Sequence, residues 1–242
     1  MVPMAKMVQE LVEVMYEDDY LMVVIKPAGM VTTREGIAAS ILPHNDKGNV
    51  YLEDWVAQYC PNNLVRKGIV HRLDKDTSGL VVVAKSEESL IRLKDIFKKR
   101  RVIKKYVALV GGEVSEKGEI KMPIKRSVYA FGRFKVDADG KMAETHFVRL
   151  KKIVIDGKKF SLVSIDLKTG RTHQIRVHFS YLGWPLAGDV TYGGTKIPGL
   201  NRQFLHSEYL EFEHPFEADK KIRTKAPLPT DLEKILDEYA KG

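Results

Sequence analysis

The chain has 242 residues, of which 44% are hydrophobic, so it can bury a sizeable core and is not a disordered protein. Its 40 Lys and Arg residues against 32 Asp and Glu give a formal net charge of +8, which favours a polyanionic partner such as nucleic acid or an anionic membrane surface. The longest apolar stretches are only five residues long, which excludes a transmembrane helix of about 20 residues.

The single cysteine, Cys60, excludes an intrachain disulfide and a Cys-x-x-Cys zinc ribbon, and it fits a reducing compartment. The first residues lack the apolar core of a secretory signal, so we expect a cytoplasmic protein. Nothing in the composition requires a metal, and we expect neither a metal nor a cofactor.

The N-terminal part of the chain predicts a hairpin, a loop and a helix. Residues 12–16 and 20–25 are strand-like apolar runs separated by the acidic turn at 17–19. Residues 32–49 contain glycine, proline and asparagine without a clean period, which predicts a long surface loop. A short helix is expected over residues 52–59.

A buried strand and an amphipathic helix are expected next. Residues 79–85 form a continuous apolar run with β-branched side chains, which is typical of a buried strand. Ser86 is expected to cap the helix that follows. Its apolar face carries Leu90, Leu93 and Phe97, and another face carries Lys94, Lys98 and Arg101.

The remaining chain is rich in predicted strands. They cover residues 102–110, 119–124, 128–136, 142–155 and 159–167. Asp139-Gly140 and Asp156-Gly157 are two-residue hairpin signals. Thr172 is expected to cap a helix that Gly183 ends, and a last helix is expected over 231–240. Strands joined mainly by hairpins predict an α+β fold, with a mixed, mostly antiparallel sheet and helices packed on it.

Two familiar signatures fail on spacing, and a third is absent. In the glycine-rich segment 188–196 the lysine follows threonine, whereas a P-loop needs Gly-Lys-Ser/Thr. His173 and His178 are five residues apart, so on a helix they lie about 140° apart and cannot share a metal. The Gly-x-Ser-x-Gly motif of hydrolases is absent.

The densest polar segment is His-Arg-Leu-Asp-Lys-Asp-Thr-Ser-Gly-Leu at residues 71–80, directly before the predicted buried strand. A turn whose Asp, Thr and Ser side chains bind backbone amides explains it without any chemistry. Alternatively, Asp74 stays ionised between Arg72 and Lys75 and acts as a nucleophile or base. The residue pattern alone leaves both interpretations open.

A second polar segment, Thr-Gly-Arg-Thr-His-Gln-Ile-Arg-Val-His at residues 169–178, lies at a strand-to-helix junction. The N-terminal end of a helix attracts anions. Arg171 and Arg176 could make structural ion pairs, or one could orient a catalytic carboxylate while the other contacts a phosphate.

Together these segments resemble the RluA-type pseudouridine synthases, whose core signature His-Arg-Leu-Asp-x-x-Thr-Ser-Gly stands at residues 71–79. The resemblance extends roughly over residues 20–232. Its further motifs, in order, are Lys26-Pro27-Ala28-Gly29, the segment 105–109, the segment 169–178, Gly183-x-Pro185 with Gly188-Asp189, and Leu205-His206 before His214-Pro215.

The resemblance implies an isomerase that converts uridine to pseudouridine in ribosomal or transfer RNA without a cofactor. It also implies a single catalytic domain over residues 20–242, with residues 1–19 as a lead-in. Many relatives carry a separate small RNA-binding module before this domain, whereas only about two dozen residues precede Lys26 here, so we expect the catalytic domain itself to capture RNA. The loop at 32–49 departs from the family pattern.

Site residues follow from the same resemblance. Asp74 is the expected catalytic carboxylate, Arg176 its charged partner, and Tyr106 a residue that lines the target base. Because the reacting atoms are hidden in a base stack, the nucleotide must be flipped out, and Arg72 is a candidate to fill the space left behind. Arg171 is a candidate phosphate contact. His71 is expected to support the loop.

Basic residues are concentrated in the window 92–105, which holds eight basic residues and one acidic residue. Lys98, Lys99 and Arg101 either form a solvated helix end or provide phosphate contacts for RNA. Two other functional classes stay open. A catalytically silent RNA-binding or chaperone protein could have the same fold, and a hydrolytic nuclease is disfavoured because no cluster has metal-binding spacing.

Overall fold

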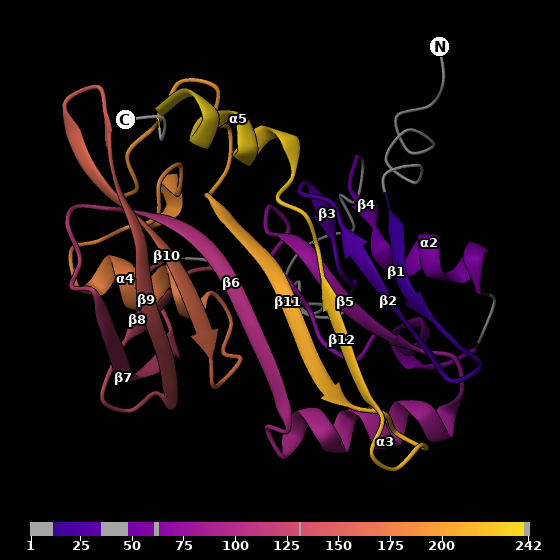
Figure 1. Ribbon diagram of the computed structural model, residues 1–242. Coiled ribbons are helices and arrows are strands. Elements are labelled where there is room, and N and C mark those ends of the chain that lie inside the picture. The colour runs from indigo at the N-terminus through magenta and orange to yellow at the C-terminus, as the bar shows by residue number, and fades with distance from the viewer. Residues whose placement is uncertain (1–11, 35–47, 61–62, 131, 240–242) are drawn as a thin grey trace. The chain divides into compact units, whose positions relative to one another are not determined.

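The computed structural model describes residues 12–34, 48–60, 63–130 and 132–239 (Figure 1). The chain forms two compact units. Unit 1 comprises Met1–Val102 and Tyr209–Ala226, and unit 2 comprises Ile103–Glu208 and Pro227–Gly242. The single domain over residues 20–242 stays a prediction. Residues 1–11 of the expected lead-in and 35–47 of the expected loop lie outside the described residues, as does Ala240 of the last helix.

The sheet of unit 1 has the strand order β1-β2-β5-β11, with β12 paired to β11. The β1–β2, β2–β5 and β11–β12 pairs are antiparallel, and a separate short pair, β3–β4, is parallel. The strands are β1 (Glu13–Glu17), β2 (Leu21–Lys26), β3 (Met30–Val31), β4 (Val50–Tyr51), β5 (Ser78–Ala84), β11 (Leu205–Glu213), of which Tyr209–Glu213 belong to unit 1, and β12 (Lys221–Lys225). The helices of this unit are α2 (Leu52–Tyr59), the 3-10 turn η1 (Val65–Gly68) and α3 (Glu87–Lys98).

The core of unit 1 confirms the expected strand and helix in the middle of its sequence. Every residue of β5 is buried. Ser86 caps α3, since its side chain accepts a hydrogen bond from the Ser89 N–H. Apolar side chains of α3 and β5 meet in one cluster, which includes Leu90, Leu93, Ile96, Leu80 and Val82. Burial of each such side chain contributes roughly 1.5–3 kcal/mol.

Unit 2 is built on an antiparallel sheet with the order β6-β10-β9-β7-β8 (Figure 1). Its strands are β6 (Val102–Gly111), β7 (Lys117–Arg126), β8 (Phe134–Val136), β9 (Lys141–Ile155) and β10 (Lys158–Leu167). Its helices are α4 (Gln174–Tyr181), the 3-10 turn η2 (Val190–Tyr192) and α5 (Thr230–Tyr239). Leu232 and Ile235 of α5 pack with Val107 and Leu109 of β6, whereas Val177 of α4 packs with residues of β7 and β9.

The predicted fold class is confirmed, because the described strands form a mixed, mostly antiparallel arrangement with helices packed on it. The Asp156-Gly157 hairpin is also confirmed. Both of its residues have positive φ, as the tight turn between β9 and β10 requires. None of the helices among the described residues is long and apolar enough to cross a membrane.

Three predictions about β8, the turn before β9 and the end of α3 were wrong. The strand expected over 128–136 is reduced to β8, because the Ser127 N–H donates to the Arg133 carbonyl and the Arg133 N–H donates to the Ala130 carbonyl, which bends the chain before β8. Residue 131 of the expected strand lies outside the described residues. Asp139-Gly140 does not join paired strands, since β8 and β9 lie on opposite sides of β7. Arg101 lies beyond α3, since the helix ends at Lys98 and Arg100 adopts a positive φ of 59°.

Candidate active site

The loop that carries Asp74 leads directly into the buried strand β5 of unit 1. Its backbone is held on both sides of Asp74. Before it, the Thr32 hydroxyl donates to the Leu73 carbonyl at 2.8 Å and accepts from the Leu73 N–H at 3.2 Å. After it, the carbonyl of Lys75 accepts from the Gly29 N–H at 3.0 Å. The Asp74 carbonyl itself accepts from the Thr77 N–H at 3.1 Å, which closes the turn.

A buried lysine ties this loop to the strand beside β5. Lys26, the last residue of β2, is fully buried. Its ammonium donates to the carbonyls of Pro27 at 2.7 Å, Met30 at 2.8 Å and Lys75 at 3.0 Å. A buried charge is costly without partners, so these three carbonyls stabilise Lys26, and Lys26 in turn positions the backbone after Asp74.

His71 also supports the loop. Its Nε2 accepts a hydrogen bond from the Val82 N–H at 3.2 Å, and its ring stacks on Phe97 of α3 with a centroid distance of 4.8 Å. Asp74 is partly exposed, and Arg72 is exposed. The loop thus presents two polar side chains on a backbone fixed by neighbouring groups, which suits a binding or catalytic role.

Unit 2 holds the two other expected catalytic residues. Tyr106 is a buried residue of β6, opposite Ile165 of β10. Arg176 is a buried residue of α4, and Asp189 binds its guanidinium through two nitrogens. Nε donates to Oδ2 at 2.6 Å and Nη2 donates to Oδ1 at 2.9 Å. The guanidinium also lies over the Tyr192 ring, 4.9 Å from its centroid.

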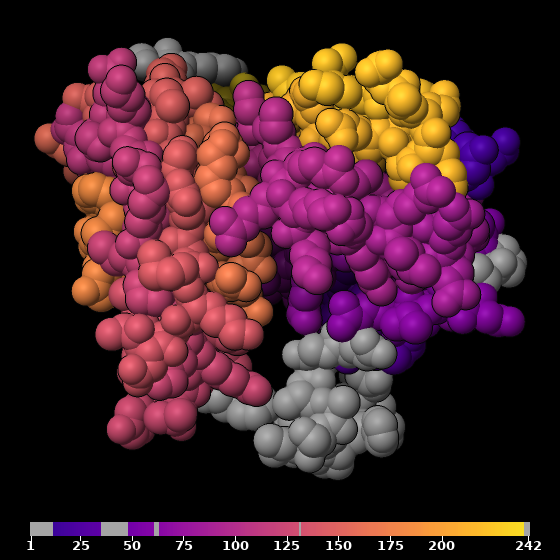
Figure 2. All heavy atoms as spheres, turned by 90° about the horizontal axis from the view of Figure 1, so that it is seen from below, coloured from indigo at the N-terminus to yellow at the C-terminus, as the bar shows by residue number. Residues whose placement is uncertain are grey.

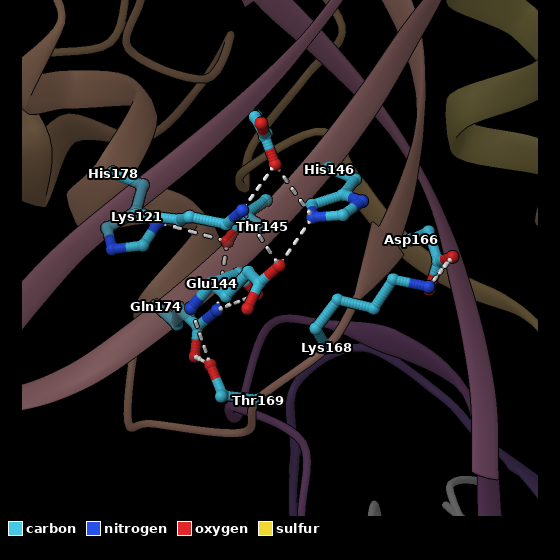
Figure 3. A network of polar contacts seen from close by, with 10 residues as sticks. Lys121, Glu144, Thr145, His146, Asp166, Lys168, Thr169, Gln174 and His178 are labelled. Carbon is cyan, nitrogen blue, oxygen red and sulfur yellow. Dashed lines mark hydrogen bonds and ion pairs between the residues drawn. The ribbon is translucent and has the colours of Figure 1, made fainter.

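The segment before α4 is shaped by the side chain of Gln174 (Figure 3). Gln174 Oε1 accepts from the Thr169 hydroxyl at 2.7 Å and from the Arg171 N–H at 3.0 Å. Its Nε2 donates to the Glu144 carbonyl and to the Thr145 hydroxyl, both at 2.9 Å. The prediction that Thr172 caps the helix was wrong, because His173, with a positive φ of 55°, precedes α4. The Gln174 bonds fix the turn at residues 169–173 in place of a side-chain cap.

The same network reaches a buried histidine at its far end (Figure 3). His178 Nδ1 lies 3.0 Å from the Thr145 hydroxyl, and Nε2 lies 3.1 Å from the Met122 carbonyl. Because a carbonyl only accepts, Nε2 carries the proton and Nδ1 accepts from Thr145. Burial lowers the pKa of His178 below its ordinary value of 6.5, so the ring is neutral at pH 7.

The expected RNA-contacting residues differ in their partners. Lys99 pairs with Asp95 at 2.8 Å, and Arg101 pairs with Glu213 at 3.0 Å and with Asp95 at 3.6 Å. Lys98 makes no ion pair with any carboxylate in the part of the chain that the structure describes. Arg171 Nε donates to the Met142 carbonyl at 3.2 Å. The exposed ion pairs of Lys99 and Arg101 are weak, so a phosphate could replace their carboxylate partners.

Two groups of His and acidic side chains lie close enough to resemble metal sites: Asp18, His214 and Glu217, and Glu119, Glu144 and His146. In the first group His214 Nδ1 accepts from two backbone N–H groups, so its Nε2 is protonated and donates to Asp18 at 2.9 Å. In the second, the Lys121 ammonium lies 2.7 Å from Glu119 and 3.6 Å from Glu144. Both groups therefore have local hydrogen-bonding or ion-pairing partners for their charges.

Of the three expected catalytic residues, Tyr106 and Arg176 belong to unit 2 and Asp74 to unit 1. Sequence reasoning missed two side chains that position these residues: Lys26, which binds the backbone after Asp74, and Asp189, which binds Arg176. Lys26 and Asp189 both stand in motifs that carry the family resemblance, Lys26-Pro27-Ala28-Gly29 and Gly188-Asp189, but neither motif reveals which atoms it binds. The available signal for a buried cation was the position of Lys26, which directly follows the apolar strand residues 21–25 and precedes Pro-Ala-Gly.

Comparisons with known proteins agree with these features. The RNA pseudouridylate synthase family matches residues 20–181, which include Asp74, Tyr106 and Arg176. The uncharacterized RNA pseudouridine synthase YlyB of Bacillus subtilis is 38% identical, over 95% of this chain and 73% of that protein. The ribosomal large subunit pseudouridine synthase D of Buchnera aphidicola is 37% identical, over 91% of this chain and 71% of that protein.

Solved structures give the same result. Human RNA pseudouridylate synthase domain containing 1 matches with a TM-score of 0.70 and 27% identity, covering 91% of this chain and 85% of that chain. Human RNA pseudouridylate synthase domain containing 4 matches with a TM-score of 0.67 and 22% identity, covering 96% of this chain and 94% of that chain. This second match supports the fold. The extent of these matches, together with the motifs around Asp74 and Arg176, shows that the chain belongs to the RNA pseudouridylate synthase family and is of RluA type.

Proposed function

We propose that this RNA pseudouridine synthase isomerises uridines in large-subunit ribosomal RNA, with Asp74 as the catalytic carboxylate. The observation that carries the proposal is the fixed backbone around Asp74, in which Thr32 holds Leu73 and Lys26 holds Lys75. A carboxylate that must meet one atom of a nucleoside needs such a base, because a misplacement of about 1 Å can cost roughly a hundredfold in rate. The large subunit is supported by the name of the Buchnera relative.

The reaction breaks the glycosidic bond at uracil N1 and joins the same ribose carbon to uracil C5. A proton leaves C5 and a proton is taken up at N1, so substrate and product are isomers. The balance requires no oxidant, reductant or group donor, and we therefore expect turnover without a cofactor. Asp74 acts either by attack on the sugar or base or by removing a ribose proton.

Arg176 is the proposed charged partner of Asp74. Arg176 matches the family arginine that pairs with this aspartate, and Asp189 binds Nε and Nη2 of its guanidinium. A cation beside a carboxylate favours its ionised form, which both chemical routes require. Tyr106 is the proposed contact to the target base, because an aromatic ring packs against a base and its hydroxyl can move a proton.

Five further residues are proposed to bind RNA. Arg72 replaces the flipped-out nucleotide in the base stack. Arg171, Lys98, Lys99 and Arg101 contact phosphates, where backbone charge supplies much of the affinity for nucleic acid. We place the reaction in the cytoplasm, the compartment that the single cysteine favours.

Release of label from uracil C5 tests the proposed function. Large-subunit ribosomal RNA transcribed with uridine tritiated at C5 should lose tritium when the purified protein is added without metal or nucleotide. A transfer RNA transcript serves as the comparison substrate. No release from either RNA would support a silent RNA-binding protein, and cleavage that a chelator inhibits would support a nuclease; both results contradict the proposal.

A further inference from the structure

A pocket of about 400 Å³ lies in unit 2, between the β7–β8 strand pair and the turn that precedes α4. Four basic residues contribute to its lining, Lys125, Arg126, Lys141 and Arg171, together with one acidic residue, Asp139. Lys125 pairs with Asp139 at 3.1 Å, and Lys141 makes no ion pair with any described carboxylate. The lining therefore has a positive excess, which favours an anionic ligand.

The loop beside the pocket displays an aromatic ring. Tyr129 is 93% exposed and its neighbour Val128 is 80% exposed, between Arg126 and Arg133. The Ser127 N–H donates to the Arg133 carbonyl at 2.8 Å, so the loop has a defined base. In Figure 2 the pink spheres of the segment around β7 and β8 project from unit 2 at the lower left. A projecting ring flanked by arginines is the arrangement that stacks on unpaired bases.

The base of this loop is tied to α4. The Phe134 N–H, at the start of β8, donates to the Tyr192 hydroxyl at 2.9 Å. The same hydroxyl lies 2.8 Å from His173 Nδ1, directly before α4, and the Tyr192 ring lies against Arg176. A ligand held by the loop and the pocket is therefore held by elements bonded to the helix of the proposed catalytic arginine.

We infer that this pocket and loop bind the RNA substrate beside its target uridine. The basic side chains contact phosphates, and Tyr129 stacks on an unpaired base. The inference rests on the proposed function and adds residues that the family motifs do not include, since Arg126, Tyr129 and Lys141 lie outside all of them. An acidic protein segment would satisfy the charge of the pocket, but it would leave the exposed ring without a stacking partner.

Two labelled RNA probes test the stacking contact: a stem–loop with unpaired uridines, and the same stem as a blunt duplex. Tyr129→Ala should weaken binding of the stem–loop roughly 5- to 150-fold, because each stacked base contributes about 1–3 kcal/mol. Binding of the duplex should stay unchanged. Tyr129→Phe keeps the ring and should bind normally, whereas Tyr129→Leu should resemble Tyr129→Ala.

The salt dependence of stem–loop binding tests the phosphate contacts. Arg126→Gln combined with Lys141→Gln should flatten the slope of log affinity against log salt by about 1.4, or roughly 0.7 for each lost contact to a single strand. Lys158→Gln is the matched control, because Lys158 is an exposed lysine at the start of β10, where it pairs with Ile155 at the end of β9 that is opposite to Lys141. Its slope should equal that of the wild type.

Three results would overturn the inference: an unchanged slope in the double variant, equal loss of stem–loop and duplex binding in Tyr129→Ala, and displacement of the stem–loop by polyglutamate at equal charge concentration. The last result would indicate a site for an acidic protein segment. If these variants bind normally while the wild type still releases tritium from C5, only this inference fails. If the wild type binds RNA but releases no tritium, the proposed function fails and the binding results stand.

Discussion

The Asp74 loop of unit 1 and the segment around Arg176 in unit 2 are held in different ways. Around Asp74, the side chains of Thr32 and Lys26 bind the backbone of the residues before and after the carboxylate. Around Arg176, the functional side chain itself is bound, through two nitrogens, by Asp189. Under the proposed roles, the backbone on both sides of the reacting carboxylate is held by Thr32 and Lys26, whereas the guanidinium that carries charge is held by Asp189 at its charged atoms.

The largest expected effect on stability comes from breaking the charged contact. Asp189→Ala leaves the buried Arg176 without this partner, and loss of one partner of a buried ion pair costs about 3–5 kcal/mol. We expect a loss of that size in the free energy of unfolding, measured by urea denaturation, together with a strong loss of turnover.

Asp231→Ala is the matched control for this prediction. Asp231 binds Arg202 with the same geometry, at 2.6 Å and 3.0 Å, but its side chain is 46% exposed whereas that of Asp189 is 1% exposed. An exposed partner contributes only about 1 kcal/mol or less. Equal destabilisation by the two substitutions would show that burial does not set the strength of the Arg176 contact.

Removal of the Lys26 ammonium, which binds the backbone carbonyls of Pro27, Met30 and Lys75, should have a smaller effect on stability. Lys26→Met keeps much of the side-chain volume but leaves three carbonyls without their donor, at a cost of about 1–3 kcal/mol for a buried unsatisfied group. Turnover should fall as well, because the backbone after Asp74 is released. Thermal unfolding and tritium release measure the two effects.

Lys85→Met provides the comparison for Lys26→Met. Lys85 follows the paired strand β5 in the same unit, and it is partly exposed and bound to Glu17 at 2.6 Å. Its replacement should change stability by about 1 kcal/mol or less and leave turnover unaltered. If both lysine variants retain wild-type turnover, the hydrogen bonds of Lys26 have no role in positioning Asp74.

The smallest expected effect is a pH dependence of the neutral network in unit 2. The pKa of His178 lies below 6.5 in the folded protein, so the unfolded chain binds the proton more readily. Stability should therefore be complete above pH 6.5 and fall below it, by at most about 1.4 kcal/mol per pH unit from this one group. His178→Gln should flatten the fall, and an unchanged pH profile would contradict the assignment.

The sequence predicted the regular elements well where one periodic signal dominated. The apolar run at residues 79–85 corresponds to β5, and the spacing of Leu90, Leu93 and Phe97 by three and four residues corresponds to α3. Strands β11 and β12 were missed, and in β12 the apolar alternation is weak in the sequence because Ile222 is its only apolar residue. The strand expected over 128–136 was wrong because β propensity does not reveal hydrogen bonds that close a turn.

The candidate site was predictable only as a set of motifs. The segment 71–79 predicts Asp74 through its resemblance to a family, and the segment 169–178 predicts Arg176 in the same way. The partners that hold these residues come from distant positions: Lys26 is 49 residues from Lys75, and Asp189 is 13 residues from Arg176. Such contacts depend on strand pairing and helix packing, which no local pattern specifies.

The measurement that tests the central claim most directly is tritium release from uracil C5 by Asp74→Asn, with RNA affinity and urea denaturation measured on the same sample. The substitution removes the negative charge and keeps the side-chain shape, and the contacts of Thr32 and Lys26 are made to the neighbouring backbone. We predict no detectable release, near-normal RNA affinity and a free energy of unfolding within about 1 kcal/mol of the wild type. Wild-type release by the folded variant would remove Asp74 from the chemistry and contradict the account.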